Sequence, residues 1–149
     1  MKRVNINISL LKIDAYDDVR ALWQECTGVY LSDADSRGNL QIYLDRNPDM
    51  SFIATAEGKA VGAVLAGHDG RRGYIHHLVV HPDCRRQGIG GKLVQRCLDV
   101  LGAAGIQKSL ILIFNDNSEG IAFWKSLGWT LRPDVCMASK VIGQVRGQA

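Results

Sequence analysis

The stretch "HPDCRRQGIGGKL", residues 81–93, is the most informative part of the sequence. It follows an apolar strand pattern and precedes an apolar helical pattern, and it concentrates two arginines and three glycines, namely Arg85, Arg86, Gly88, Gly90 and Gly91. Unpaired backbone N–H groups and the positive end of a helix dipole would meet here. Glycine lets the backbone approach a phosphate closely and tolerates positive φ. The stretch therefore predicts an anion site.

Two familiar phosphate motifs do not fit this stretch. A Walker loop requires Ser or Thr after its lysine, but Lys92 is followed by Leu93. The segment "GIGGKL" also lacks the Gly-x-Gly-x-x-Gly spacing of a dinucleotide fingerprint. A tight turn that holds no ligand therefore remains the alternative to an anion site in this stretch.

Outward from this stretch, the N-terminal part begins with a strand and two helices. Apolar residues at every second position predict the strand, namely Val4, Ile6, Ile8 and Leu10. Asp14 is expected to cap a helix whose apolar residues recur every three or four positions, namely Tyr16, Val19, Leu22, Trp23 and Cys26. A second helix runs through Leu40 and Tyr43, and we expect it to stop at Asn47 because Pro48 follows.

The remainder alternates strands and helices. The segments "SFIATA" and "AVGAVLAG" predict two strands joined by a glycine turn, and Asp69-Gly70 predicts a hairpin that leads into the central strand "YIHHLVV". Then follow a helix over 90–104, a strand over 108–114, a short helix over 119–128 and an extended region over 129–139. We predict one α+β domain over residues 1–149, with a mixed, mostly antiparallel sheet and helices on its faces.

Composition excludes several classes of protein. The net charge of +3 is too small and too scattered to indicate nucleic-acid binding. No apolar run is long enough to span a membrane, and the N-terminus does not resemble a signal peptide, so we expect a cytoplasmic protein. The four cysteines show no metal or thioredoxin-like spacing, which predicts reduced thiols and no metal: Cys26, Cys84, Cys97 and Cys136.

Two motifs together resemble one family. Arg-x-x-Gly-x-Gly after a strand that ends Val-His-Pro is similar to the acetyl-CoA loop of the GCN5-related N-acetyltransferase (GNAT) superfamily. The segment "NSEGIAFWKSLGW", residues 117–129, resembles a second motif of that superfamily. The resemblance spans nearly the whole chain. It implies helices on both faces of the sheet and a central pair of strands that splay apart.

The resemblance also implies acetyl-CoA as cosubstrate and names the residues that would hold it. Backbone groups of Leu78, Val79 and Val80 would pair with the pantetheine arm, as an added peptide strand would. Asn117 would contact the coenzyme beyond the next strand. The pyrophosphate would lie on the loop formed by Arg85, Arg86, Gln87, Gly88, Ile89, Gly90 and Gly91.

The implied reaction is direct attack of an amine on the thioester. A backbone N–H near Val79 or Val80 would stabilise the oxyanion. Tyr74, His76 and Leu78 are expected on one face of the central strand, with His77 on the opposite face. His76 is the candidate base because imidazole titrates near neutral pH. The alternative is that His76 only lines the cleft.

Two positions depart from the family pattern. Trp124 stands where many relatives carry a tyrosine that protonates the departing thiolate, and an indole N–H is not a usable acid. Water or Tyr74 would then take that role, while Trp124 would pack against the thiol end of the coenzyme or simply in the core. Leu112 stands where relatives that acetylate a ribosomal protein N-terminus carry glutamate. This weakens the interpretation that the chain acetylates a protein N-terminus.

The acceptor is expected to be a small-molecule amine bound by the N-terminal helices and their connection. Acidic and aromatic residues there would attract a cation and cover an apolar part, namely Asp33, Asp35, Asp45, Trp23, Tyr30 and Tyr43. Arg71 and Arg72 would instead favour a carboxylate. The alternatives are a protein or peptide acetyltransferase, a non-catalytic acetyl-CoA sensor and a phosphate-binding structural domain. A homodimer is compatible with the resemblance, although no sequence feature decides it.

Overall fold

The computed structural model of the chain describes residues 5–143, so Val4 of the expected first strand lies outside the described residues. One five-stranded sheet runs in the order β1-β2-β3-β4-β5. Its strands are β1 (Asn7–Leu10), β2 (Phe52–Ala56), β3 (Lys59–His68), β4 (Gly73–Val80) and β5 (Ser109–Leu110). Neighbours are antiparallel from β1 to β4, and β5 joins β4 in parallel. The prediction of a mixed, mostly antiparallel sheet is confirmed.

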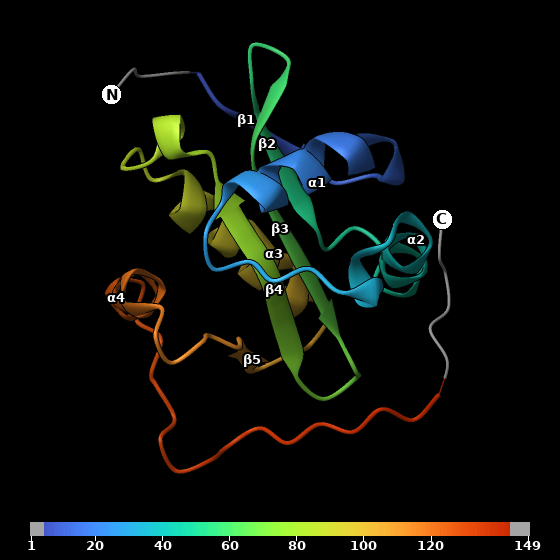
Figure 1. Cartoon of the computed structure of the whole chain (residues 1–149), viewed down its shortest axis with the longest axis vertical. Helices are drawn as coiled ribbons and strands as arrows, with labels where there is room; N and C mark the ends of the chain where they lie inside the picture. Colours follow the sequence, from blue (N-terminus) through green and yellow to red (C-terminus); the bar gives the residue numbers. More distant parts are fainter. Residues whose placement is uncertain (1–4, 144–149) are drawn as a thin grey trace.

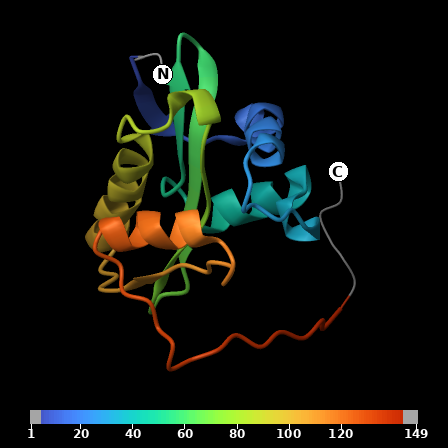
Figure 2. The ribbon, with the colours of Figure 1, turned by 60° about the vertical axis from the view of Figure 1, so that its left-hand side comes forward.

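Helices cover both faces of this sheet. They are α1 (Tyr16–Glu25), α2 (Arg37–Arg46), α3 (Ile89–Ala103) and α4 (Ser118–Ser126). Figure 2 shows α1 and α2 on one side of the sheet and α3 and α4 on the other. We call these the α1 face and the α3 face. Among the described residues, no helix is both long and apolar enough to cross a membrane.

Most predicted boundaries agree with the structure. Helix α2 ends at Arg46 with Asn47 as its C-cap, as expected from the proline that follows. In the β3–β4 hairpin, Asp69 Oδ1 accepts the backbone N–H groups of Arg71 and Arg72. The predicted capping role of Asp14 is wrong. This residue lies within a short 3₁₀ turn, η1 (Ile13–Ala15), and α1 continues from that turn without a side-chain cap.

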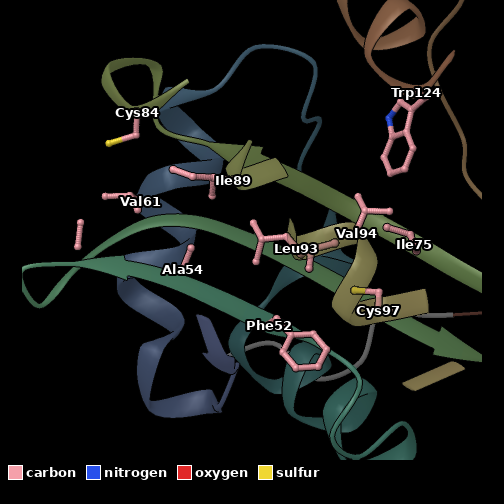
Figure 3. Packing of buried hydrophobic residues seen from close by; sticks show 13 residues of the cluster. Phe52, Ala54, Val61, Ile75, Cys84, Ile89, Leu93, Val94, Cys97 and Trp124 are labelled. Carbon is pink, nitrogen blue, oxygen red and sulfur yellow. The ribbon is translucent and has the colours of Figure 1, made fainter. Parts of the chain in front are cut away.

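The core consists of two apolar layers, one on each face of the sheet. On the α3 face, Leu93, Val94 and Cys97 pack against Ile75 and Ala54, as Figure 3 shows. The α1 face has its own buried cluster, formed by Tyr16, Val19, Leu22, Trp23, Leu40, Ile53, Ala63, Leu65 and Val79, among others. The central strands are therefore covered on both sides, which fixes their position relative to the helices.

A β-bulge in β4 changes which side chains share a face. Leu65 pairs with His76 and Ala63 with Val79, so two residues of β4 lie opposite one residue of β3. His77, the first of the two, has φ +50°, a left-handed conformation that is uncommon outside glycine but enriched in histidine. Leu78 packs on the α3 face beyond this bulge. The predicted shared face of Tyr74, His76 and Leu78 is therefore wrong.

The C-terminal third holds less strand than predicted. Only Ser109 and Leu110 pair with β4, although residues 108–114 were expected to form a strand. Ile111 and Ile113 still pack against the core, while Leu112 and Phe114 are exposed. Residues 129–143 form no helix or strand, and Figure 1 shows this segment leading away past β5. Among the described residues, no strand pairs with residues 111–114.

We expect Leu93→Ala to lower the free energy of unfolding by about 2–5 kcal/mol, because this fully buried side chain would leave a cavity between α3 and the sheet. Urea unfolding followed by circular dichroism measures the change. Gln95→Ala on the exposed side of the same helix is the matched control, with an expected change within about 0.5 kcal/mol. Equal effects of the two substitutions would contradict the packing described for α3.

Candidate functional site

The first turn of α3 lies just beyond the end of β4. Gly88 is the N-cap residue with φ +79°, and Lys92 N–H donates to the carbonyl of Gly88 at 3.1 Å. The amide groups of residues 89–91 therefore precede the first intrahelical hydrogen bond. They and the dipole of a fifteen-residue helix point out of this end. The arrangement can receive an anion.

The three glycines of the loop do not share one role. Only Gly88 has positive φ, and a Cβ built on it would meet no atom within 4 Å. Gly90 and Gly91 are helical, and a Cβ on Gly90 would lie 3.0 Å from Phe123 Cζ. Positive φ is therefore used at Gly88, whereas the backbone of Gly90 and Gly91 is helical. Gly90 instead permits close packing of α3 against α4.

The side chains of the loop point in different directions. Arg85 turns back toward the sheet, where its Nε donates to the Val80 carbonyl at 3.1 Å, and Cys26 Sγ donates to the same oxygen at 3.6 Å. Arg86 is exposed and has φ +62°. Ile89 is buried in the core, so only its backbone can face a ligand. Of the two arginines expected at the anion site, Arg85 thus fixes the end of β4.

Past Tyr74, β4 has no strand partner on its β5 side among the described residues. Residues 75–80 therefore present a free backbone edge toward the gap between β4 and the segment after β5. Asn117 lies across this gap at the start of α4, where its Oδ1 accepts the Gly120 N–H at 3.0 Å. Its Nδ2 lies 3.0 Å from a Cβ built on Gly28. The connection between α1 and α2 therefore reaches the N-terminus of α4.

Trp124 lies in the core on the α3 face and is 8% exposed. Its ring makes edge contacts with Trp129 at 4.8 Å and Phe123 at 5.4 Å between centroids. Figure 3 shows its indole beside Val94 and Ile75. This packing is compatible with both expected roles, a contact with the thiol end of the coenzyme and packing in the core.

Two aromatic side chains enclose His76 on the α1 face. The rings of Tyr74 and His76 are nearly parallel with centroids 6.3 Å apart, and Tyr43 of α2 makes an edge contact at 6.1 Å. Burial lowers the pKa of His76, and the neighbouring His77 lowers it further. Tyr43 carries a buried hydroxyl with no hydrogen-bond partner among the described residues. His76 is thus held neutral in a largely aromatic environment.

His77 lies on the same face as His76, which contradicts the predicted alternation. Its Nε2 lies 2.8 Å from Asp35 Oδ1, and its ring contacts Trp23 of α1 with centroids 5.1 Å apart. The left-handed backbone at the bulge explains this direction. The sequence pattern did not predict the contact between His77 and Asp35. The available signal was histidine itself, since its tolerance of positive φ permits a bulge at this position.

Asp35 belongs to η2 (Asp33–Asp35), a short 3₁₀ turn between α1 and α2. Its Oδ2 accepts the Ser32 backbone N–H at 3.0 Å, and Tyr16 donates its hydroxyl to the Asp35 carbonyl at 2.6 Å. Burial alone would raise the pKa of Asp35, but the hydrogen bonds from His77 and Ser32 outweigh it and hold the pKa below its ordinary value. Asp35 therefore remains ionised beside His77.

The other predicted acceptor residues are dispersed. Trp23 is buried in the core, and Tyr30 is exposed and contacts Phe114 with ring centroids 4.4 Å apart. Asp33 is exposed, and Asp45 accepts a hydrogen bond from Gln41 of its own helix. Arg71 and Arg72 lie at the exposed tip of the β3–β4 hairpin. Three of the predicted acceptor residues nevertheless contact the two histidines, namely Asp35, Trp23 and Tyr43.

Elsewhere, a shallow hollow of about 500 Å³ lies beside β1 and η1, and none of its lining residues belongs to β4 or to the glycine loop. Within residues 5–143, no group of three or more His, Cys, Asp or Glu side chains gathers as a metal site would require.

Comparisons with known proteins identify the family. The model of the acetyltransferase (GNAT) family matches residues 16–129. An acetyltransferase of Sodalis glossinidius (strain morsitans) is 29% identical to this chain over 91% of its length and 94% of the relative.

Solved structures show the same fold. AAC(6')-Iy in complex with the bisubstrate analogue CoA-S-monomethyl-acetylneamine superposes with a TM-score of 0.74 at 19% identity, covering 93% of this chain and 99% of that one. The PaiA N-acetyltransferase of Thermoplasma acidophilum in complex with coenzyme A gives 0.71 at 17% identity, over 82% and 87% of the two chains. The family and fold expected from the two sequence motifs are confirmed. This chain belongs to the acetyltransferase (GNAT) family.

Proposed function

We propose that this chain transfers an acetyl group from acetyl-CoA to a primary amine of a small molecule. The observation that carries the proposal is the open space before Gly88 at the start of α3, next to the free edge of β4, in a chain of this family. AAC(6')-Iy and PaiA were solved with a coenzyme A analogue and with coenzyme A, which supports the same cosubstrate here.

Each part of the proposed coenzyme site has a physical role. The amides of Gly88 to Gly91 would bind the pyrophosphate, with Arg86 and Gln87 beside them and Arg85 fixing the end of β4. Backbone groups of Leu78, Val79 and Val80 would pair with the pantetheine arm. Asn117 would contribute its Nδ2, since its Oδ1 caps α4. Trp124 would act through packing near the thiol end. Acetyl-CoA supplies the activated acetyl group.

The acceptor side provides groups that handle protons. The amine must lose its ammonium proton before its nitrogen can attack a carbonyl carbon. His76 is our candidate for this base because burial keeps its imidazole neutral. Tyr74, whose ring lies next to His76, is our candidate for returning a proton to the thiolate, since Trp124 cannot. Asp35, Trp23 and Tyr43 would line the acceptor pocket. A cytoplasmic location and a homodimer stay predictions.

A two-stage experiment tests the function. Titration calorimetry with acetyl-CoA, CoA and ATP is followed by a free-thiol assay of the acetyl-CoA complex against aminoglycosides, polyamines, amino acids and short peptides. We expect binding of the CoA compounds but not of ATP, and thiol release with one small-molecule class. Release with peptides alone would indicate a protein acetyltransferase. Binding without any release would indicate a sensor, which the replacement of the usual tyrosine by Trp124 favours.

We expect Gly88→Asn to raise the Kd for CoA at least about tenfold, equivalent to about 1.4 kcal/mol. Asparagine tolerates left-handed backbone, so the fold persists while its side chain enters the space before α3. Gly102→Ala is the matched control, because its Cβ also meets no atom within 4 Å but lies far along α3. Unchanged affinity of a folded Gly88→Asn chain would contradict the loop assignment.

We expect the rate of transfer to fall at acidic pH, because only the neutral imidazole of His76 can accept a proton. The pKa of His76 is lowered from its ordinary value of 6.5, so the fall should occur below that pH. His76→Ala should reduce kcat by about 100-fold and remove this acidic limb, while calorimetry gives an unchanged Kd for CoA. A pH–rate profile that keeps both its height and its acidic limb in the variant would show that His76 only lines the cleft.

A further inference from the structure

We propose that His77, oriented by Asp35, is a second proton-accepting group of this site. The inference rests on the proposed acetyl transfer and concerns the same reaction. It starts from the bulge in β4, which turns the ring of His77 toward α1 and η2, onto the side of the sheet where His76 also lies. A regular strand would have sent the two imidazoles to opposite faces.

The contact with Asp35 defines which nitrogen of His77 can act. Asp35 is ionised and accepts hydrogen bonds only, so the Nε2 that lies 2.8 Å from its Oδ1 carries the proton. When the ring is neutral, Nδ1 then has a free lone pair. This is the arrangement in which a carboxylate fixes the tautomer and direction of a catalytic imidazole.

The surroundings hold this pair in place. Asp35 is fixed through Ser32 and Tyr16, and Trp23 packs against the ring of His77. The side chains of His77 and Asp35 are 23% and 11% exposed, so the imidazole stays accessible while the carboxylate behind it is covered. His76, by contrast, contacts aromatic rings, and no carboxylate hydrogen-bonds to it in the described part of the chain. The ionisable groups facing His77 are Asp35 and His76.

The reaction can use a second proton-accepting group. As an ammonium becomes an amide, the N–C bond forms, the C–S bond breaks, and the nitrogen loses two protons. One proton equivalent ends on the CoA thiol and the other passes to solvent. His76 accounts for one transfer from nitrogen. His77 would accept the other, with Asp35 as a positioning residue that acts through the ring.

A double-mutant cycle tests the pair. His77→Asn keeps a residue that tolerates left-handed backbone but removes the base, and Asp35→Asn removes the charge behind it. We expect each to lower kcat at least about tenfold, with the Kd for CoA little changed. The double variant should be no slower than His77→Asn alone, because the two residues act as one unit.

Two further readouts separate catalysis from structural support. Free imidazole should restore turnover to His77→Gly but not to Asp35→Asn. Glu25→Gln is the matched control, since it removes the charge from another histidine–carboxylate pair of this strand region, Glu25–His81 at 3.1 Å, and should stay within about twofold of the wild-type rate. Nitrogen NMR of the chain without ligands should show neutral His77 as the Nε2–H tautomer, and Asp35→Ala should abolish that preference.

Three results would overturn the proposal: kcat of His77→Asn close to that of the unmodified chain, additive losses in the double variant, or a neutral His77 with its proton on Nδ1. These outcomes concern the pair alone, provided that the unmodified chain transfers acetyl groups. If the unmodified chain binds acetyl-CoA but transfers to no amine, the proposed function and this inference both fail.

Discussion

The left-handed backbone at His77 is the constraint on which the site depends. A non-glycine residue in this conformation costs energy that surrounding contacts must offset. Here the contacts come from Asp35, Trp23 and the pairing of β4 with β3 on both sides of the bulge. The bulge also shifts Leu78 to the α3 face. One local distortion therefore sets both the direction of the His77 ring and the direction of the strand that would meet the coenzyme.

The pairing of His77 with Asp35 also ties together parts of the chain that are distant in sequence. Asp35 lies in the connection between α1 and α2, and the same connection contacts Phe114 through Tyr30 and approaches Asn117 through Gly28. It therefore extends from the bulge of β4 to the start of α4. A segment held at several points in this way has a defined position beside the candidate site.

Periodicity made most of the fold predictable from the sequence. The apolar runs of β2 and β3, the Asp69-Gly70 turn and the stop before Pro48 each reflect a local rule, and each element formed where expected. The start of α3 directly after Gly88 followed from glycines beside a helical pattern, and anion binding there stays a prediction. The bulge was not predictable from the presence of histidine alone, because its stabilising partner lies forty-two residues away. The length of β5 depends on a missing neighbour, and the role of Gly90 depends on Phe123. These are tertiary effects.

The cysteines were predicted to be reduced thiols, and their locations give them unequal reactivity. Cys26, Cys84 and Cys97 are buried, and burial raises the pKa of Cys97 to about 12. Cys136 is exposed on the segment after α4. Because alkylation requires an accessible thiolate, the folded chain offers a single position for covalent labelling. A fluorophore attached there would lie outside the core and would report on the surroundings of the C-terminal segment.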